Sequence, residues 1–117
     1  MMEDLKPVLE GLGIDVDGAL KRMMGSEALF LRLMKKFASD TSYEKLKEAI
    51  EKQDYEEAYR AAHTLKGASG NLGLNPIMVT AGRISDKLKN NDSGTLEADF
   101  AELTKVHGEI FEVLRGL

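Results

Sequence analysis

The sequence predicts an all-α fold, an antiparallel four-helix bundle with short N-terminal helices packed at one end. Apolar residues recur every three or four positions along most of the chain, which is the period of an amphipathic helix. The alternation of apolar and polar residues that is typical of strands is missing. Seven helical patterns can be distinguished, and the four longer ones, joined by short connections, are expected to form the bundle. The length favours a single domain over residues 1–117.

The first two helical patterns are short and have clear start signals. We expect a helix from Asp4 to Leu12 that Asp4 caps, with Pro7 in its first turn, where proline is tolerated. Asp15 should cap a second helix over Val16–Met24, and the glycine that follows should end it. These two pieces are too short to span a bundle, so we expect them at its end.

Two further helices begin at residues with a side-chain hydroxyl. Ser26 should cap a helix whose apolar stripe runs from Leu29 to Phe37, with basic residues on its other side. Thr41 and Glu44 have the spacing of a capping box, in which each side chain bonds the backbone N–H of the other residue. They predict a third short helix.

Three longer helices follow. Asp54 and Glu57 also have the spacing of a capping box, and they open a helix that we expect to end near Leu72 to Gly73. Asn75-Pro76 should cap and start the next helix. The last helix should run from about Thr95 to Leu114, because its apolar residues share one face at about 100° per residue.

The most informative stretch is Ala61–Gly73, which contains His63, one of only two histidines. Counted at about 100° per residue, the small and apolar residues of this helix share one arc, and His63 lies far from its middle. Lys66 follows three residues later and Gly67 four residues later, so both lie on the side of the histidine. The pattern predicts an exposed imidazole with a cation and open space beside it.

Such an arrangement suits a histidine that carries a phosphoryl group. Neutral imidazole is a competent nucleophile near neutral pH because its unperturbed pKa is about 6.5. Lys66 could offset the negative charge of a bound phosphoryl group, and Gly67 would leave room for a partner protein. A glycine inside a helix costs about 1 kcal/mol relative to alanine, so Gly67 and Gly70 indicate close approach by another molecule.

These residues resemble a known family. The signature of histidine-containing phosphotransfer (HPt) domains is similar to His63-Thr64-Leu65-Lys66-Gly67, Ser69 and Gly73 of this chain. Asp54–Ala58 and Gly13–Asp15 are also similar to that family, so the resemblance covers nearly the whole chain. Ile84-Ser85 departs from it, because family members often carry Leu-Glu there. The resemblance implies a helical bundle that relays phosphoryl groups between receiver-domain aspartates in a multistep two-component phosphorelay.

The resemblance also implies roles and partners. His63 would accept the phosphoryl group, at Nε2, and Lys66 would neutralise its charge. The chain is not expected to be an enzyme, since it lacks a Gly-x-x-x-x-Gly-Lys loop or another nucleotide site. The expected partners are receiver domains of response regulators and a hybrid histidine kinase, with magnesium supplied by the receiver and no cofactor of this chain's own. We expect a docking surface around His63 that comprises Tyr59, Gly67, Gly70 and Leu74, with Leu31 and Met78 as weaker candidates.

Composition argues against several other functions. The formal net charge of −4 gives no electrostatic support for a nucleic-acid partner. The absence of cysteine removes disulfides and thiol chemistry. No apolar run approaches the ~20 residues of a membrane span. We therefore expect a cytoplasmic monomer that binds neither nucleic acid nor membrane.

Two other classes of function compete with this one. A pure interaction module would dock receivers or kinases without transferring phosphate, and the intact histidine motif argues against it. A ferritin-like metal site needs a glutamate three residues before a histidine, where this chain has Arg60 and Thr104, so no metal site is predicted. His107 lies on the apolar stripe of the last helix and is expected to be a partly buried structural residue. Direct phosphorylation of His63 by a kinase, as in chemotaxis kinases, stays open.

Overall fold

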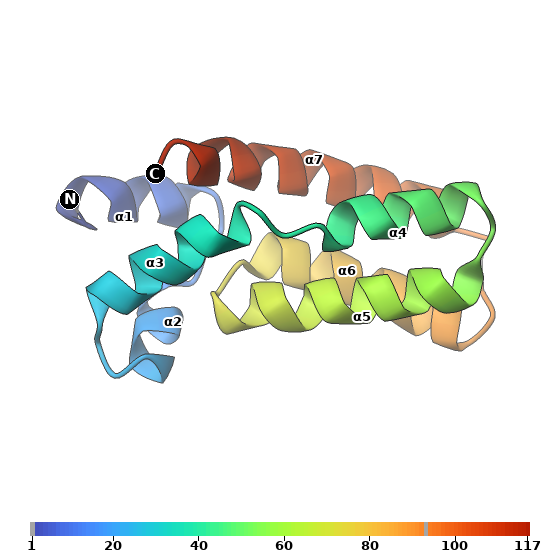
Figure 1. Cartoon of the computed structure of the whole chain (residues 1–117), viewed down its shortest axis with the longest axis horizontal. Coiled ribbons are helices and arrows are strands. Elements are labelled where there is room, and N and C mark those ends of the chain that lie inside the picture. The colour runs from blue at the N-terminus through green and yellow to red at the C-terminus, as the bar shows by residue number, and fades with distance from the viewer. Residues whose placement is uncertain (1, 93) are drawn as a thin grey trace.

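The computed structural model describes residues 2–92 and 94–117, and this part of the chain contains seven helices and no strand (Figure 1). The helices are α1 (Met2–Gly11), α2 (Val16–Arg22), α3 (Glu27–Phe37), α4 (Ser42–Glu51), α5 (Tyr55–Asn71), α6 (Asn75–Lys89) and α7 (Leu96–Arg115). The predicted all-α class is confirmed.

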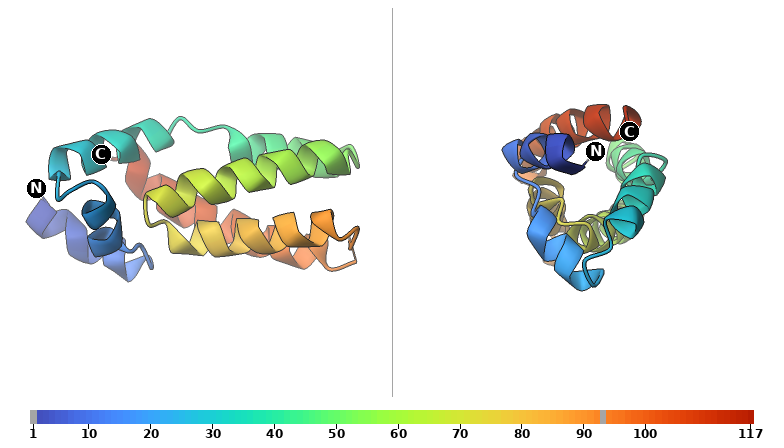
Figure 2. Two further views of the ribbon diagram at one scale, coloured as in Figure 1. Left: turned by 90° about the horizontal axis from the view of Figure 1, so that it is seen from below. Right: turned by 90° about the vertical axis from the view of Figure 1, so that its left-hand side faces the viewer.

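Helices α4 to α7 run antiparallel, each beside the next, and form the predicted four-helix bundle (Figures 1 and 2). The molecule is elongated, with extents of 43 × 24 × 21 Å. The two short helices α1 and α2 lie at the end of the bundle where α7 terminates (Figure 1). This end placement agrees with the prediction from the sequence.

One side of the bundle is shared by α3 and α4, which follow one another along it (Figure 1). The sequence pattern favours the longer α3 as a bundle helix, whereas in the structure the short α4 packs along α5, and α3 lies beside only its last turns. Residues 38–41 interrupt the helix between them. The Asp40 carboxylate accepts a hydrogen bond from the Ser42 backbone N–H at 2.8 Å, and this bond helps to start a new helix at that point.

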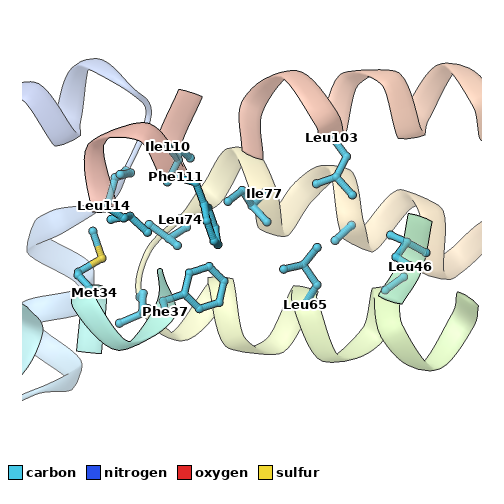
Figure 3. Close-up of a cluster of buried hydrophobic side chains, with 14 of the residues drawn as sticks. Met34, Phe37, Leu46, Leu65, Leu74, Ile77, Leu103, Ile110, Phe111 and Leu114 are labelled. Carbon is cyan, nitrogen blue, oxygen red and sulfur yellow. The ribbon is translucent and has the colours of Figure 1, made fainter. Parts of the chain in front are cut away.

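A single hydrophobic core receives side chains from all seven helices. Within it, Phe37 of α3 lies close to Phe111 of α7 (Figure 3). The Phe37 and Phe111 rings meet edge to face, with centroids 5.4 Å apart and planes inclined by 61°. Full burial of each such large apolar side chain contributes about 1.5–3 kcal/mol, so the core couples α3 to the bundle.

Three of the predicted N-caps are confirmed. The side chains of Asp15, Ser26 and Asp54 each accept a hydrogen bond from the backbone N–H three residues later, at 3.0, 3.2 and 3.2 Å. In the capping box predicted around Asp54, only this half forms. The Glu57 carboxylate instead pairs with Arg60 of the next turn, with Nη2–Oε2 at 2.7 Å.

Three other predicted caps are wrong. Asp4 lies inside α1, which includes Met2, so Pro7 is within the helix and not in its first turn. Thr41 occupies the N-cap position of α4 but makes no side-chain capping bond, so the predicted capping box with Glu44 does not form. Asn75 is already helical, and Leu74 occupies the N-cap position of α6.

The end of α5 is closed by a tight turn at Gly73, as predicted. Gly73 has φ +73°, and the Leu74 backbone N–H donates to the Ser69 carbonyl at 2.9 Å, the pattern of a Schellman motif. The Gly73 carbonyl then accepts the Asp15 N–H at 2.8 Å. A Cβ at position 73 would lie 2.4 Å from the Asp15 carbonyl oxygen, so only glycine permits this contact.

Arg22 of α2 makes a second connection to the same helix end. Its Nη2 donates to the Gly70 carbonyl at 3.0 Å, and its Nε donates to the Asn71 carbonyl at 3.4 Å. A cation at the carbonyl end of a helix is favourable, because the last carbonyls lack partners within the helix. The N-terminal segment thus holds the last turn of α5 through two separate contacts.

Candidate functional site

The helix α5 turns a face of small residues inward and its polar residues outward. Ala58, Ala61, Ala62 and Leu65 are buried on the inner face, which lets α4 and α6 approach closely. The buried Ser69 hydroxyl donates to the Leu65 carbonyl at 2.6 Å, so it leaves no unpaired polar group in the core. This division of the helix fixes the direction in which its outer residues point.

His63 lies on the outer face of α5 and is exposed to solvent. Its ring stacks on that of Tyr59, one turn earlier, with centroids 5.9 Å apart and planes inclined by 18°. Tyr59 is half-buried and packs against the core, so it provides a fixed surface on one side of the imidazole. None of the hydrogen bonds within residues 2–92 and 94–117 involves the His63 ring, which leaves its nitrogens available for chemistry.

Lys66 lies one turn beyond His63 and is also exposed. Its aliphatic stem passes over Gly82 of α6, where a methyl group on the glycine Cα would lie 3.5 Å from both Cδ and Cε of the lysine. Within the described parts of the chain, Lys66 forms no ion pair. Its ammonium group is therefore available to an incoming anion.

The two glycines predicted beside the histidine differ in their surroundings. Around Gly67 there is open space, since a Cβ there would meet no heavy atom within 4 Å. At Gly70 a Cβ would lie 2.9 Å from Sδ of Met78, because this methionine of α6 covers the glycine. Gly67 therefore leaves the surface flat beside His63, and Gly70 makes room for a neighbouring side chain.

Comparison with known protein families agrees with this geometry. A model of the Hpt domain family matches residues 36–115, which is more than half of the chain. The chain belongs to the Hpt domain family. Neither the curated proteins nor the solved structures that were compared contain a match.

Membership of the Hpt family establishes the general function. Hpt domains act in histidine phosphotransfer within phosphorelays, where they interact with receiver domains and kinases. They are phosphocarriers and not enzymes with a catalytic site of their own.

Within residues 2–92 and 94–117, no three histidine, cysteine or acidic residues gather as metal ligands. In the same residues, no helix has the length and apolar character needed to cross a bilayer.

Leu74 does not belong to the surface of this Hpt domain. Its side chain is fully buried, with 0% exposure, so its predicted role in docking is wrong. The reason is local: Leu74 follows Gly73 in the Schellman motif, and this turn folds the leucine back onto the core between α5 and α6 (Figure 3). The two weaker candidates, Leu31 and Met78, are half-buried.

A groove that the sequence did not reveal lies on the other flank of α5, between this helix and α3. It encloses about 400 Å³ and is lined by Leu33, Lys36, Phe37, Ser39, Asp40, Ala68, Asn71 and Leu72. Its existence depends on how α3 sits beside the last turns of α5. Helical periodicity within either segment carries no signal for such a pairing.

His107, the second histidine of this Hpt domain, has the opposite environment from His63. Its ring is buried between Tyr43 and Phe111, with centroid distances of 4.2 and 3.8 Å. Burial lowers the pKa of His107, an effect that nearby Glu44 opposes. Its Nε2 is buried without a hydrogen-bond partner in the described structure. His107 is more deeply buried than the partly buried structural residue that the sequence predicts.

Proposed function

We propose that His63 accepts a phosphoryl group from an aspartyl phosphate of a receiver domain and passes it to an aspartate of a second receiver. The donor would be the receiver of a hybrid histidine kinase, and the acceptor that of a response regulator. The observation that carries this proposal is the contrast between the two histidines. His63 is exposed beside open space at Gly67, whereas His107 is enclosed by aromatic rings.

The transfer requires only the lone pair of a neutral imidazole. A ring nitrogen of His63 attacks phosphorus while the bond from phosphorus to the aspartyl oxygen breaks, and its electrons return to the carboxylate. In the second step, the carboxylate of another receiver attacks phosphorus, and the N–P bond breaks to restore the imidazole. Each step makes one bond and breaks one, so this chain needs no nucleotide and no metal of its own. Catalysis rests on positioning and on charge neutralisation in the complex.

The residues around His63 support the two transfers in different ways. Tyr59 limits the orientations of the ring by stacking on it. Lys66 supplies a cation against the roughly two negative charges of a phosphoryl group. Gly67 lets the receiver approach, while Gly70 acts indirectly, because Met78 covers it and contributes the surface at that point.

We propose that residues 1–117 form one domain that acts as a monomer in the cytoplasm. Leu9 of α1 and Val16 of α2 are fully buried in the same core as the bundle residues, which supports a single folding unit. Receiver domains would dock on the exposed face of α5 around His63.

The test is phosphoryl transfer from a panel of radiolabelled, phosphorylated receiver domains to the intact chain. We expect acid-labile, alkali-stable label on the intact protein, no label on His63→Gln, and full label on His107→Phe. No label from any receiver, or equal label on His63→Gln, would overturn the proposal and favour an interaction module that docks without transfer. A kinase fragment without a receiver serves as a further donor, and label from it alone would favour direct phosphorylation.

A further inference from the structure

Gly82 is a buried glycine in the interior of α6, where no turn or chain reversal requires it. Its φ does not lie in the left-handed region, unlike that of Gly73. A residue this small in the middle of a buried helix face points to a neighbour that a larger side chain would displace.

The space above Gly82 is filled by Lys66. The three heavy atoms nearest to a Cβ at this position are all in the lysine side chain, with Cδ and Cε at 3.5 Å and Cγ at 3.9 Å. The backbone of α5 is not among them. Close approach of two backbones, which explains Gly73, therefore does not explain Gly82.

The pairing follows the antiparallel register of α5 and α6. Gly70 of α5 contacts Met78 of α6. One turn earlier in α5 and one turn later in α6, Lys66 contacts Gly82. In the first pair the methionine of α6 covers the glycine of α5. In the second pair the lysine of α5 covers the glycine of α6. The lysine stem thus lies in a gap between the two helices, one turn from His63.

We infer that Gly82 is a positioning residue for Lys66: the small size of residue 82 lets the lysine stem lie against α6, where a larger side chain would displace it. This inference rests on the proposed function of His63 and Lys66. A free lysine side chain has many rotamers, and a stem in contact with α6 has fewer, while its ammonium group stays in water. Position 82 thereby keeps an unpaired cation beside the phosphoryl acceptor.

The test compares Gly82→Leu with Gly82→Ala. A leucine would occupy the seat and displace the lysine stem, so we expect transfer from a receiver to slow by about tenfold or more, as when a charge-assisted contact is lost. An alanine Cβ would make ordinary van der Waals contact at 3.5 Å, so Gly82→Ala should keep the wild-type rate. Gly108→Leu is the matched control, because Gly108 is an exposed helical glycine of α7 with nothing within 4 Å.

A mutant cycle separates positioning from a merely structural role. If Gly82 acts through Lys66, Gly82→Leu should cost nothing further in a Lys66→Ala background. Nuclear Overhauser effects between Gly82 Hα and the Hδ and Hε protons of Lys66 in the wild-type protein give a second readout that needs no variant to fold. Additive losses in the cycle, or the absence of these effects, would overturn the inference while leaving His63 as the acceptor. A wild-type chain that takes no label from any receiver would overturn the proposed function as well.

Discussion

The rings of Tyr59 and His63 stack one turn apart on the outer face of α5, with centroids 5.9 Å apart and planes inclined by 18°. Tyr59 is held by the core on its other side, so the imidazole has a fixed support although it is exposed. This support restricts the rotation of a ring that must meet phosphorus in line.

Replacing Tyr59 by leucine should therefore slow phosphoryl transfer to His63. An aromatic pair is worth about 0.5–1.5 kcal/mol beyond its buried area, which corresponds to a factor of about 2 to 10 in rate. Tyr59→Phe keeps the ring and should keep the rate. The transfer rate from one phosphorylated receiver, followed by quenching the reaction at set times, measures both variants. Equal losses of rate in both would mean that the hydroxyl, and not the ring stacking, is important.

Replacing Gly67 by leucine should separate stability from function. The site is helical, exposed and open, so the substitution should raise the free energy of unfolding by up to about 1 kcal/mol through helix propensity. The same side chain should obstruct a receiver and weaken transfer by about tenfold or more, as in a steric clash worth over about 1.4 kcal/mol. Urea unfolding and transfer kinetics measure the two effects. Unchanged transfer would place the receiver away from Gly67.

Gly73→Ala should destabilise the fold. The residue would need φ +73°, and its Cβ would lie 2.4 Å from the Asp15 carbonyl oxygen. Strain in the left-handed region costs about 1–3 kcal/mol, and the clash adds to it. Urea unfolding should show this loss, whereas Gly11→Ala, at a position with nothing within 4 Å, should be close to neutral. A loss of similar size in both variants would contradict the role of the Asp15 contact.

His107 should make the fold less stable as the pH falls. Desolvation lowers its pKa in the folded state below the unfolded value, and Arg115 adds to this, whereas Glu44 and Asp40 oppose it. The unfolded chain then binds the proton more readily than the folded chain. Stability is fully present above the unfolded pKa of about 6.5 and declines as the pH falls toward the folded pKa.

The check is the urea midpoint between about pH 7.5 and about pH 5.5, a window in which histidine titrates and most carboxylates do not. The wild-type midpoint should fall across this window, and the free energy of unfolding should decrease by at most about 1.4 kcal/mol per pH unit. His107→Phe, which keeps an aromatic ring between Tyr43 and Phe111, should flatten the slope. Parallel slopes in the two proteins would assign the pH dependence to another group.

The sequence predicts the parts of this site that depend on one helix alone. The exposure of His63 and the position of Lys66 on its side follow from the period of α5, because that period holds wherever the helix packs. The burial of His107 follows in the same way from α7. The end of α5 at Gly73 is a local signal that glycine supplies directly.

The parts that sequence reasoning missed depend on a sharp change of chain direction or on contacts between distant segments. Leu74 is adjacent to the exposed face along the chain, but the turn at Gly73 sends it into the core. The groove beside Ala68 requires α3 to lie next to α5, and the seat of Lys66 requires the register of α6. The periodicity of apolar residues within one helix predicts neither the pairing of α3 with α5 nor the register between α5 and α6.

The contacts that Asp15 and Arg22 make with α5 have a consequence for dissection of the protein. The family match begins at residue 36, yet the carbonyls of Gly70, Asn71 and Gly73 find partners in residues 15 and 22. A fragment cut at the family boundary would lack Asp15 and Arg22. The Gly70 and Gly73 carbonyls would then keep only their local bonds from the Gly73 and Asn75 N–H groups, and the last turn of α5, two turns beyond His63, would lose its connection to the N-terminal segment. The region that the family model matches is thus shorter than the region whose contacts support the end of α5.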